Sequence, residues 1–345
     1  MIWRVLEYPR FRLVDLPTPV ERAVNLSREL GIELYVKRDD VMGLALGGNK
    51  ARKLEFVLAD TLSRGCDVVV TRGATHSNHV RLTAAAARRA GLDFYAVVTP
   101  PGKPLAQGNI LLDLVLGARL LYVDSVEEAE RAVDKLVEEL RSKGRRPCAV
   151  PPGAACELGV LGYVLAALEI VEQCYEYGYK PKYVVHASGT GATQAGLLLG
   201  FKLLGVEGVE VIGVSDGVSA EVLAERVSRL FNATARMLQV EYRLEPEDVS
   251  VYEDPGLGGY GAVSREVVEA ILLAARLEGL LLDPVYTGRA LHGLVKLVES
   301  GVIEKGSQVV FIHTGGAPIL FHYAEEIANY LESRGEAVTS LKRVS

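Results

Sequence analysis

A lysine stands directly after a glycine turn, at the start of a predicted helix. The chain reads Gly47-Gly48-Asn49-Lys50, and residues 50–62 carry apolar side chains at helical spacing. The free amides at a helix start carry partial positive charge, which disfavours a cation there and lowers its pKa. A lysine with a lowered pKa can form a Schiff base with an aldehyde. An ordinary solvated basic turn is the alternative for this segment taken alone.

A second polar cluster follows the apolar run of residues 68–71. It contains His76, Ser77, Asn78 and His79, at the start of another predicted helix. A helix start favours an anionic group such as a carboxylate. Simple capping of the helix explains Ser77 or Asn78, but it does not require the whole cluster.

A glycine- and hydroxyl-rich loop follows the apolar run of residues 183–186 and leads into a predicted helix. Free amides and hydroxyls in such a place can hold a phosphate group. The glycine spacing matches neither a nucleotide P-loop nor a dinucleotide fingerprint. The loop residues are Gly189, Thr190, Gly191, Ala192 and Thr193.

Three later loops add hydroxyl groups at predicted strand ends, namely those of Tyr260, Tyr286 and Thr314. Each alone is commonly a surface turn residue, but the three together fit one shared cleft. A reactive lysine beside a phosphate loop that is not nucleotide-specific suggests pyridoxal phosphate, which needs both features.

Short apolar runs alternate with longer helical stretches, as expected for parallel sheets in an open α/β fold. Ligands of such folds bind beyond the carboxyl ends of the strands, where the polar loops lie. We predict a small domain at residues 54–162, inserted into a large domain of residues 1–53 and 163–345. The predicted strands are residues 34–38, 68–71, 94–98, 120–123, 183–186, 210–214 and 308–312. The predicted helices are residues 50–62, 78–90, 106–116, 126–143, 158–175, 193–204, 264–278, 288–300 and 321–333.

The bulk composition narrows the class of protein. The chain has 345 residues, 49% of them hydrophobic, and a formal net charge of -6. This charge does not suggest nucleic-acid binding, and no apolar run approaches a membrane span. The four cysteines (Cys66, Cys148, Cys156, Cys174) form no C-x-x-C pair, so we expect neither a metal site nor a disulfide framework. A soluble, cytoplasmic protein is expected.

The chain resembles the pyridoxal-phosphate enzymes grouped as aminocyclopropane-carboxylate deaminases and D-cysteine desulfhydrases. The resemblance runs through residues 16–19, 37–40, 47–50, 77–81, 190–196, 283–286 and 313–316, and covers nearly the whole chain. It implies the fold type II architecture, with two open, twisted, mainly parallel sheets and helices on both faces. It also implies a homodimer with the active site between the two domains.

The resemblance also implies roles for individual residues. Lys50 would hold pyridoxal 5'-phosphate as a Schiff base and move the substrate Cα proton. Asn78 would reach the phenolic oxygen of the ring, the loop 189–193 would hold the phosphate, and Thr314 would face the pyridine nitrogen. Ser77, Asn78 and His79 would bind the substrate carboxylate, with Tyr260, Tyr286 and Thr287 around the substrate.

The same resemblance favours one activity over another. The deaminases would carry Glu after the tyrosine and Leu at the last position, where this chain has Thr287 and Thr314. We therefore expect β-elimination from D-cysteine or a related β-substituted amino acid, giving pyruvate, ammonia and sulfide. The alternatives are aminocyclopropane-carboxylate deamination, elimination from L-cysteate, racemisation, sulfide addition, and an inactive cofactor-binding homologue. His76 replaces the Gln common in the family, and is either a specificity residue or a packed loop residue.

Overall fold

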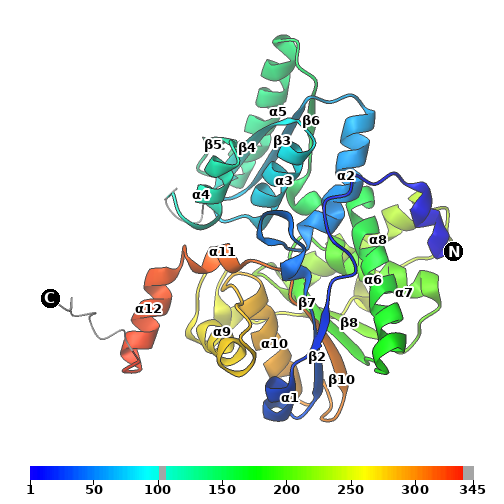
Figure 1. Cartoon of the computed structure of the whole chain (residues 1–345), viewed down its shortest axis with the longest axis vertical. Helices are drawn as coiled ribbons and strands as arrows, with labels where there is room; N and C mark the ends of the chain where they lie inside the picture. The colour runs from blue at the N-terminus through cyan, green and yellow to red at the C-terminus, as the bar shows by residue number, and fades with distance from the viewer. Residues whose placement is uncertain (101–105, 337–345) are drawn as a thin grey trace.

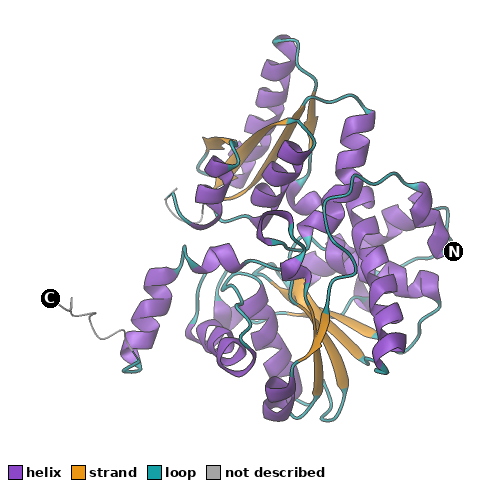
Figure 2. Ribbon diagram, in the orientation of Figure 1, coloured by secondary structure: helices purple, strands orange, loops and turns teal. Residues whose placement is uncertain are grey.

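Two mostly parallel sheets with helices around them make up the protein (Figures 1 and 2). The computed structural model describes residues 1–100 and 106–336. The larger sheet has the order β1 (Val20–Arg22), β2 (Glu33–Lys37), β10 (Gln308–Ile312), β7 (Tyr183–Ser188), β8 (Glu210–Ser215), β9 (Val251–Tyr252). The smaller sheet has the order β5 (Arg119–Tyr122), β4 (Asp93–Thr99), β3 (Val68–Ala74), β6 (Pro147–Ala149). Every pairing is parallel except that of β1 with β2.

The helices cover the faces of both sheets. They are α1 (Val24–Leu30), α2 (Lys50–Ser63), α3 (Asn78–Arg89), α4 (Gly108–Val115), α5 (Val126–Ser142), α6 (Glu157–Tyr177), α7 (Ala192–Leu204), α8 (Ala220–Met237), α9 (Arg265–Glu278), α10 (Thr287–Glu299), α11 (Ala317–Leu320) and α12 (Ala324–Ser333). One apolar core joins the larger sheet to α1, α9 and α10, and another joins the same sheet to α6 and α7 (Figure 1). All six residues of β7 are buried, as expected for a strand covered on both faces.

The predicted fold class is confirmed, with differences in detail. The seven predicted strands are present, but β1, β6 and β9 were not predicted; each has only two or three residues. Helices α1, α8 and the short α11 were also missed, and the helix predicted at residues 321–333 is α12, which begins three residues later. The domain limits stay a prediction. The smaller sheet lies inside residues 54–162, while both limits fall within helices, α2 and α6.

Helix α6 differs from the sequence expectation about membrane spans. It is 21 residues long with a mean hydropathy of 1.4, enough by length and composition to cross a membrane. However, 67% of that stretch is buried inside the protein, where α6 packs on α2, α7 and α8. A core helix of a globular protein has the same character.

A buried cluster of charges fixes helix α2, which begins at Lys50. The Arg52 guanidinium contacts Asp39 at 2.9 Å and Glu169 at 2.7 Å, and Lys37 contacts the same Glu169 oxygen at 2.8 Å. Arg52 and Asp39 are essentially inaccessible to solvent. Because buried charges are tolerated only when paired, this cluster holds the first turn of α2 against β2 and α6.

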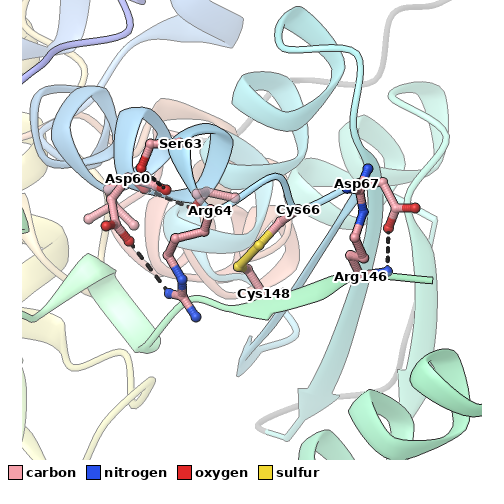
Figure 3. Close-up of a disulfide and its surroundings, with 9 residues drawn as sticks. Asp60, Ser63, Arg64, Cys66, Asp67, Arg146 and Cys148 are labelled. Carbon is pink, nitrogen blue, oxygen red and sulfur yellow. Dashed lines mark hydrogen bonds and ion pairs between the residues drawn. A yellow bond between two sulfur atoms is a disulfide. The ribbon is translucent and has the colours of Figure 1, made fainter. Parts of the chain in front are cut away.

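The expectation that no disulfide forms is wrong for one pair of cysteines. Cys66 follows α2, Cys148 lies in β6, and the two are joined with their Cα atoms 5.9 Å apart (Figure 3). Two backbone contacts between Asp67 and Arg146 lie beside the bond: the Asp67 amide donates to the Arg146 carbonyl, and the Arg146 amide donates to the Asp67 carboxylate. The two cysteines are 82 residues apart in the sequence, and only the pairing of β6 with β3 brings them together. The sequence alone therefore did not indicate the bond. Cys156 and Cys174 are free, and both are only partly buried.

Candidate active site

A cavity of 320 Å³ lies where strands of both sheets end. Its walls include Ala74 and Ser188, the last residues of β3 and β7, together with Asp216 after β8 and Thr314 after β10. The expectation that a ligand site lies beyond the carboxyl ends of the strands (the strand-end rule) therefore locates the cavity correctly. Most of the predicted site residues line it: Lys50, Ser77, Asn78, His79, Gly189, Thr190, Gly191, Thr193, Tyr260, Tyr286 and Thr314. Ala192 and Thr287 do not.

Lys50 is the first residue of α2, and its side chain enters this cavity. Its Nζ donates to Asn49 Oδ1 at 3.0 Å. Its pKa is lowered to about 8, chiefly by burial, while the negative charges of Asp216 and Asp283 oppose the shift. The predicted direction is present, but burial is the main cause rather than the helix start.

The turn before Lys50 needs glycine because other backbone segments approach it closely. Gly47 and Gly48 have positive φ values of 64° and 125°. A Cβ on Gly47 would lie 2.0 Å from the Asp40 carbonyl oxygen. The Asn49 amide donates to the Thr314 carbonyl at 3.0 Å, so the turn is bonded to the end of β10. This bond fixes Lys50 relative to the larger sheet.

The loop between β7 and α7 forms a cup at a helix start. Gly191 has φ 85° and immediately precedes α7, so the amides of the first turn of α7 are free of helical partners. Thr193 Oγ1 accepts from Asn49 Nδ2 at 3.0 Å, which ties the cup to the lysine turn. A Cβ on Gly153 would lie 2.8 Å from the Thr190 side chain, so the Pro152–Ala154 turn closes the cup on another side.

The start of α3 supplies the second set of free amides. Ser77 caps the helix, its Oγ accepting from the Val80 amide at 3.3 Å. The His79 ring is engaged elsewhere, with Nε2 2.9 Å from Thr71 Oγ1 and Nδ1 3.3 Å from Thr83 Oγ1. Burial lowers the His79 pKa to about 3, so the ring is neutral. Any contact of His79 with an anion is therefore expected through its backbone amide.

His76 does not line the cavity. Its ring stacks on that of His322, with centroids 3.3 Å apart, and meets Tyr323 edge-on. The structure thus favours the interpretation of His76 as a packed loop residue.

The two tyrosines meet at the cavity, and their hydroxyl groups hydrogen-bond to each other. Burial raises the Tyr286 pKa well above its usual value, so this phenol stays protonated. Tyr286 follows Asp283, whose Oδ1 accepts the backbone amides of Val285 and Tyr286. Arg289 holds the Tyr260 loop by donating to four carbonyl groups, those of Leu257, Gly258, Gly259 and Ala262.

Thr287 is buried behind the cavity rather than in it. Its hydroxyl donates to Asp283 Oδ2 at 2.8 Å and accepts from the Asp283 amide at 2.8 Å. Thr314 does line the cavity, beside the turn that leads to Lys50. Of the two threonines expected near the substrate and the cofactor, only Thr314 is placed to touch either one.

Sequence reasoning missed several charged residues in or near the cavity. Asp216 is 94% buried, has no hydrogen-bond partner for Oδ1 within the described part of the chain, and has a pKa raised to about 6 by burial. It stands at the end of β8, so the strand-end rule could have identified it. Arg226 also lines the cavity and donates to the Gly189 carbonyl at 3.0 Å.

Lys53 is a further buried lysine, one helical turn after Lys50. Its pKa is lowered well below the usual value, first by burial and then by the Lys50 charge. Within residues 1–100 and 106–336 no carboxylate pairs with it. Burial without an acidic partner favours the neutral amine, and Lys53 does not line the cavity; its Nζ lies 5.7 Å from the centroid of the Tyr163 ring.

These residues fit pyridoxal phosphate. A helix start with a glycine cup suits its phosphate, a lysine with a pKa of about 8 suits its aldehyde, and the cavity volume is in the range of small-ligand sites. Glycine is needed in the cup because a Cβ on Gly189 would lie 1.9 Å from the Asp216 carboxylate, so only glycine lets this loop lie against the end of β8. In the described residues no group of acidic, His or Cys side chains could hold a metal ion.

Comparisons with known proteins agree with pyridoxal phosphate as the cofactor. A family model described as "Pyridoxal-phosphate dependent enzyme" matches residues 12–315. A Pyrococcus abyssi protein, provisionally named a 1-aminocyclopropane-1-carboxylate deaminase, is 42% identical over 94% of this chain and 96% of its own. A D-cysteine desulfhydrase of Klebsiella pneumoniae is 40% identical over 92% of this chain and 96% of its own. The crystal structure of an ACC deaminase homologue has a TM-score of 0.88 at 40% identity, covering 96% of this chain and 99% of that one.

Proposed function

Because the chain belongs to the family of pyridoxal-phosphate dependent enzymes, matched over residues 12–315, we propose that it cleaves β-substituted amino acids of the D-cysteine type. The reaction would convert D-cysteine and water to pyruvate, hydrogen sulfide and ammonia. Curated relatives named as D-cysteine desulfhydrases, at 40% identity, support this substrate class.

Residues from both sheets would hold the cofactor. The amides of the 189–193 loop and Thr193 suit the phosphate, and the Lys50 amine suits the aldehyde. Asn78 and Thr314 stand on other walls of the same cavity. When bound, pyridoxal phosphate withdraws electrons from the Cα of an attached amino acid and makes the Cα proton acidic.

The protein's own groups would do the rest. The free amides of α3, with Ser77 at the helix start, would bind and orient the substrate carboxylate. Lys50 Nζ, with a pKa of about 8, can release and accept a proton near neutral pH, so it would take the proton from Cα. The hydroxyl groups of Tyr260 and Tyr286 bond to each other and would lie beside the substrate.

One observation carries the preference for elimination over opening of a cyclopropane ring. Position 287, where the deaminases would carry Glu, holds a threonine hydroxyl bonded to the buried Asp283 carboxylate. A glutamate there would set two buried carboxylates against each other, so this fold is adapted to threonine. Position 287 therefore offers no acid to the substrate.

Aminocyclopropane-carboxylate deamination is the second candidate, and Asp216 favours it. This carboxyl lines the cavity with a pKa of about 6, so it could donate a proton to a carbon leaving group. Relatives provisionally named as deaminases support the same activity. Elimination from L-cysteate, racemisation, sulfide addition and an inactive homologue are weaker alternatives.

A substrate panel on the purified protein separates these functions. D-cysteine, L-cysteine, L-cysteate and aminocyclopropane-carboxylate would each be supplied to the cofactor-loaded enzyme. We expect pyruvate and sulfide to form in equal amounts from D-cysteine, with Lys50→Ala as the inactive control. Release of 2-oxobutyrate from the cyclopropane alone would reject elimination as the function and support the role of Asp216.

Location and assembly complete the proposal. We infer a soluble cytoplasmic homodimer, supported by the family resemblance and by the burial of the apolar helix α6. No role for a nucleic acid or a membrane is proposed.

A further inference from the structure

Asn78 is the first member of a series of buried, hydrogen-bonded polar side chains that leads away from the cavity. Its Oδ1 lies 2.9 Å from Nδ2 of Asn109, a residue of α4 with no solvent exposure. The Asn109 Oδ1 lies 2.9 Å from Nη1 of Arg81, which is also fully buried. Asn109 and Arg81 do not line the cavity, so neither can contact a ligand there.

The arginine decides which way both amides point. A guanidinium has only donors, so the Asn109 atom beside Arg81 must be its oxygen. The other end of Asn109 is then its NH₂ group, whose two hydrogens go to Asn78 Oδ1 and to the His76 carbonyl at 2.7 Å. Every donor and acceptor direction of Asn109 is therefore fixed by its partners.

Asn78 is oriented in turn. Its oxygen is held by Asn109, so its NH₂ group is the end left for the cavity that Asn78 lines. No group within residues 1–100 and 106–336 accepts those hydrogens. The same Arg81 donates through Nη2 to the Gly47 carbonyl at 2.8 Å, so it also holds the turn before Lys50.

We propose that Asn109 is a positioning residue that presents the Asn78 NH₂ group to the cavity as a hydrogen-bond donor. The matching acceptor is the phenolic oxygen of pyridoxal phosphate. This inference rests on the proposed function and names a residue that acts on the cofactor through Asn78. It explains why a polar amide is retained at a fully buried position of α4, where an apolar residue would be less costly.

The test replaces Asn109 with Asp and with Ala. Aspartate keeps the shape and the Arg81 contact, but it cannot donate, so it loses the bonds to the His76 carbonyl and to Asn78 Oδ1. We expect Asn78 then to turn its NH₂ group toward residue 109 and its oxygen toward the cavity. Alanine leaves Asn78 free to adopt either orientation. We expect the affinity for pyridoxal phosphate to fall 10- to 100-fold in Asn109→Asp and less in Asn109→Ala. A purely structural role predicts that the loss of affinity follows the loss of stability in both variants, and that the pH dependence of the cofactor's absorbance is unchanged.

Two measurements go beyond activity. Fluorescence titration of the apoprotein gives the dissociation constant of pyridoxal phosphate. The pH dependence of the bound cofactor's absorbance reports on the charge at its phenolic oxygen, and should move to higher pH when the donor is lost. Asp113→Asn is the matched control, because it makes the reverse exchange one turn later in α4, at a buried residue that does not touch Asn78. It should bind within twofold of the wild type.

The Asn78→Ala variant tests whether Asn109 acts through Asn78. There, Asn109→Asp should weaken binding less than twofold further, because the residue it acts through is gone. An equal loss in both backgrounds, or wild-type affinity and absorbance in Asn109→Asp, would overturn the inference. A wild-type protein that binds no pyridoxal phosphate would instead reject the proposed function.

Discussion

Replacing Asp216 with Asn should shift the titration of Lys50 to lower pH. Burial lowers the Lys50 pKa to about 8, and the Asp216 charge is the largest influence in the opposite direction. Asp216 has a pKa of about 6, so it is ionised when Lys50 titrates and stabilises the ammonium form. Its neutral amide leaves burial less opposed, so the Lys50 pKa must fall further.

The size of the effect follows from these values. With a pKa of about 8, roughly 10% of Lys50 is neutral at pH 7, against about 0.03% for an unperturbed lysine. An opposite charge at close range shifts a pKa by about one unit or more. Asp216→Asn should therefore bring the Lys50 pKa to about 7 and make about half of the amine neutral at pH 7. Its reaction with an aldehyde at that pH should be about fivefold faster.

The assay is the rate at which apoprotein reacts with pyridoxal phosphate, followed by absorbance from pH 6 to pH 9. The titration of free pyridoxal phosphate is the same for each variant, so it cancels in the comparison. We expect a half-maximal rate near pH 8 for the wild type and for Asp113→Asn, and about one unit lower for Asp216→Asn. An unchanged midpoint, or one moved upward, would refute the assignment of Asp216 as the main opposing charge.

Three further variants test how the site is held in place. Cys148→Ser removes the disulfide that closes a loop of 82 residues, which should cost about 4.5 kcal/mol of stability and lower the melting temperature by about 6 °C. An equal melting temperature of the wild-type protein with and without reductant would contradict this. Arg52→Met leaves the buried Asp39 carboxylate without its ion-pair partner and Glu169 with Lys37 alone, so denaturant unfolding should show a loss of about 3–5 kcal/mol, and a change below 1 kcal/mol would mean that the cluster is dispensable. Ser77→Ala removes the N-cap of α3 and should cost about 1 kcal/mol, with a larger relative fall in kcat/KM than in stability if the hydroxyl also serves the substrate.

Most residues that line the cavity could be predicted from the sequence, because strand ends and glycine turns are local patterns. Gly47 and Gly191 are required by positive φ values, and a positive φ is the condition that glycine satisfies at least cost. Each stands beside the polar residues that it positions. For this reason the cavity walls could be predicted before their relative placement was known.

The orientation of individual side chains could not be predicted in this way. Thr287 follows Tyr286 directly, but the Asp283 carboxylate turns its hydroxyl away from the cavity. The His79 ring likewise contacts two threonine hydroxyls, Thr83 in its own helix and Thr71 in β3. Such outcomes depend on contacts across the fold, which no local pattern records.

Some misses were avoidable and others were not. Helix α8 has Leu223, Val227 and Leu230 buried on one face and Ser219 as its cap, which is a readable helical pattern. Strand β6 has three residues and begins with a proline, so it carries almost no strand signal of its own. Its place beside β3 also determines the cysteine pairing, which explains why the strand and the disulfide were missed together.

The bond between Cys66 and Cys148 makes most of the smaller sheet a covalent ring. Strands β3, β4 and β5 lie wholly between the two cysteines along the chain, and β6 contains the second one. A single backbone cleavage anywhere in that stretch therefore cannot release a fragment while the bond is intact. The first and last strands of the ring are also neighbours in the sheet, so the sheet has the closed connectivity of a circular chain. The wall of the active site that this sheet contributes could thus survive a break in its own backbone.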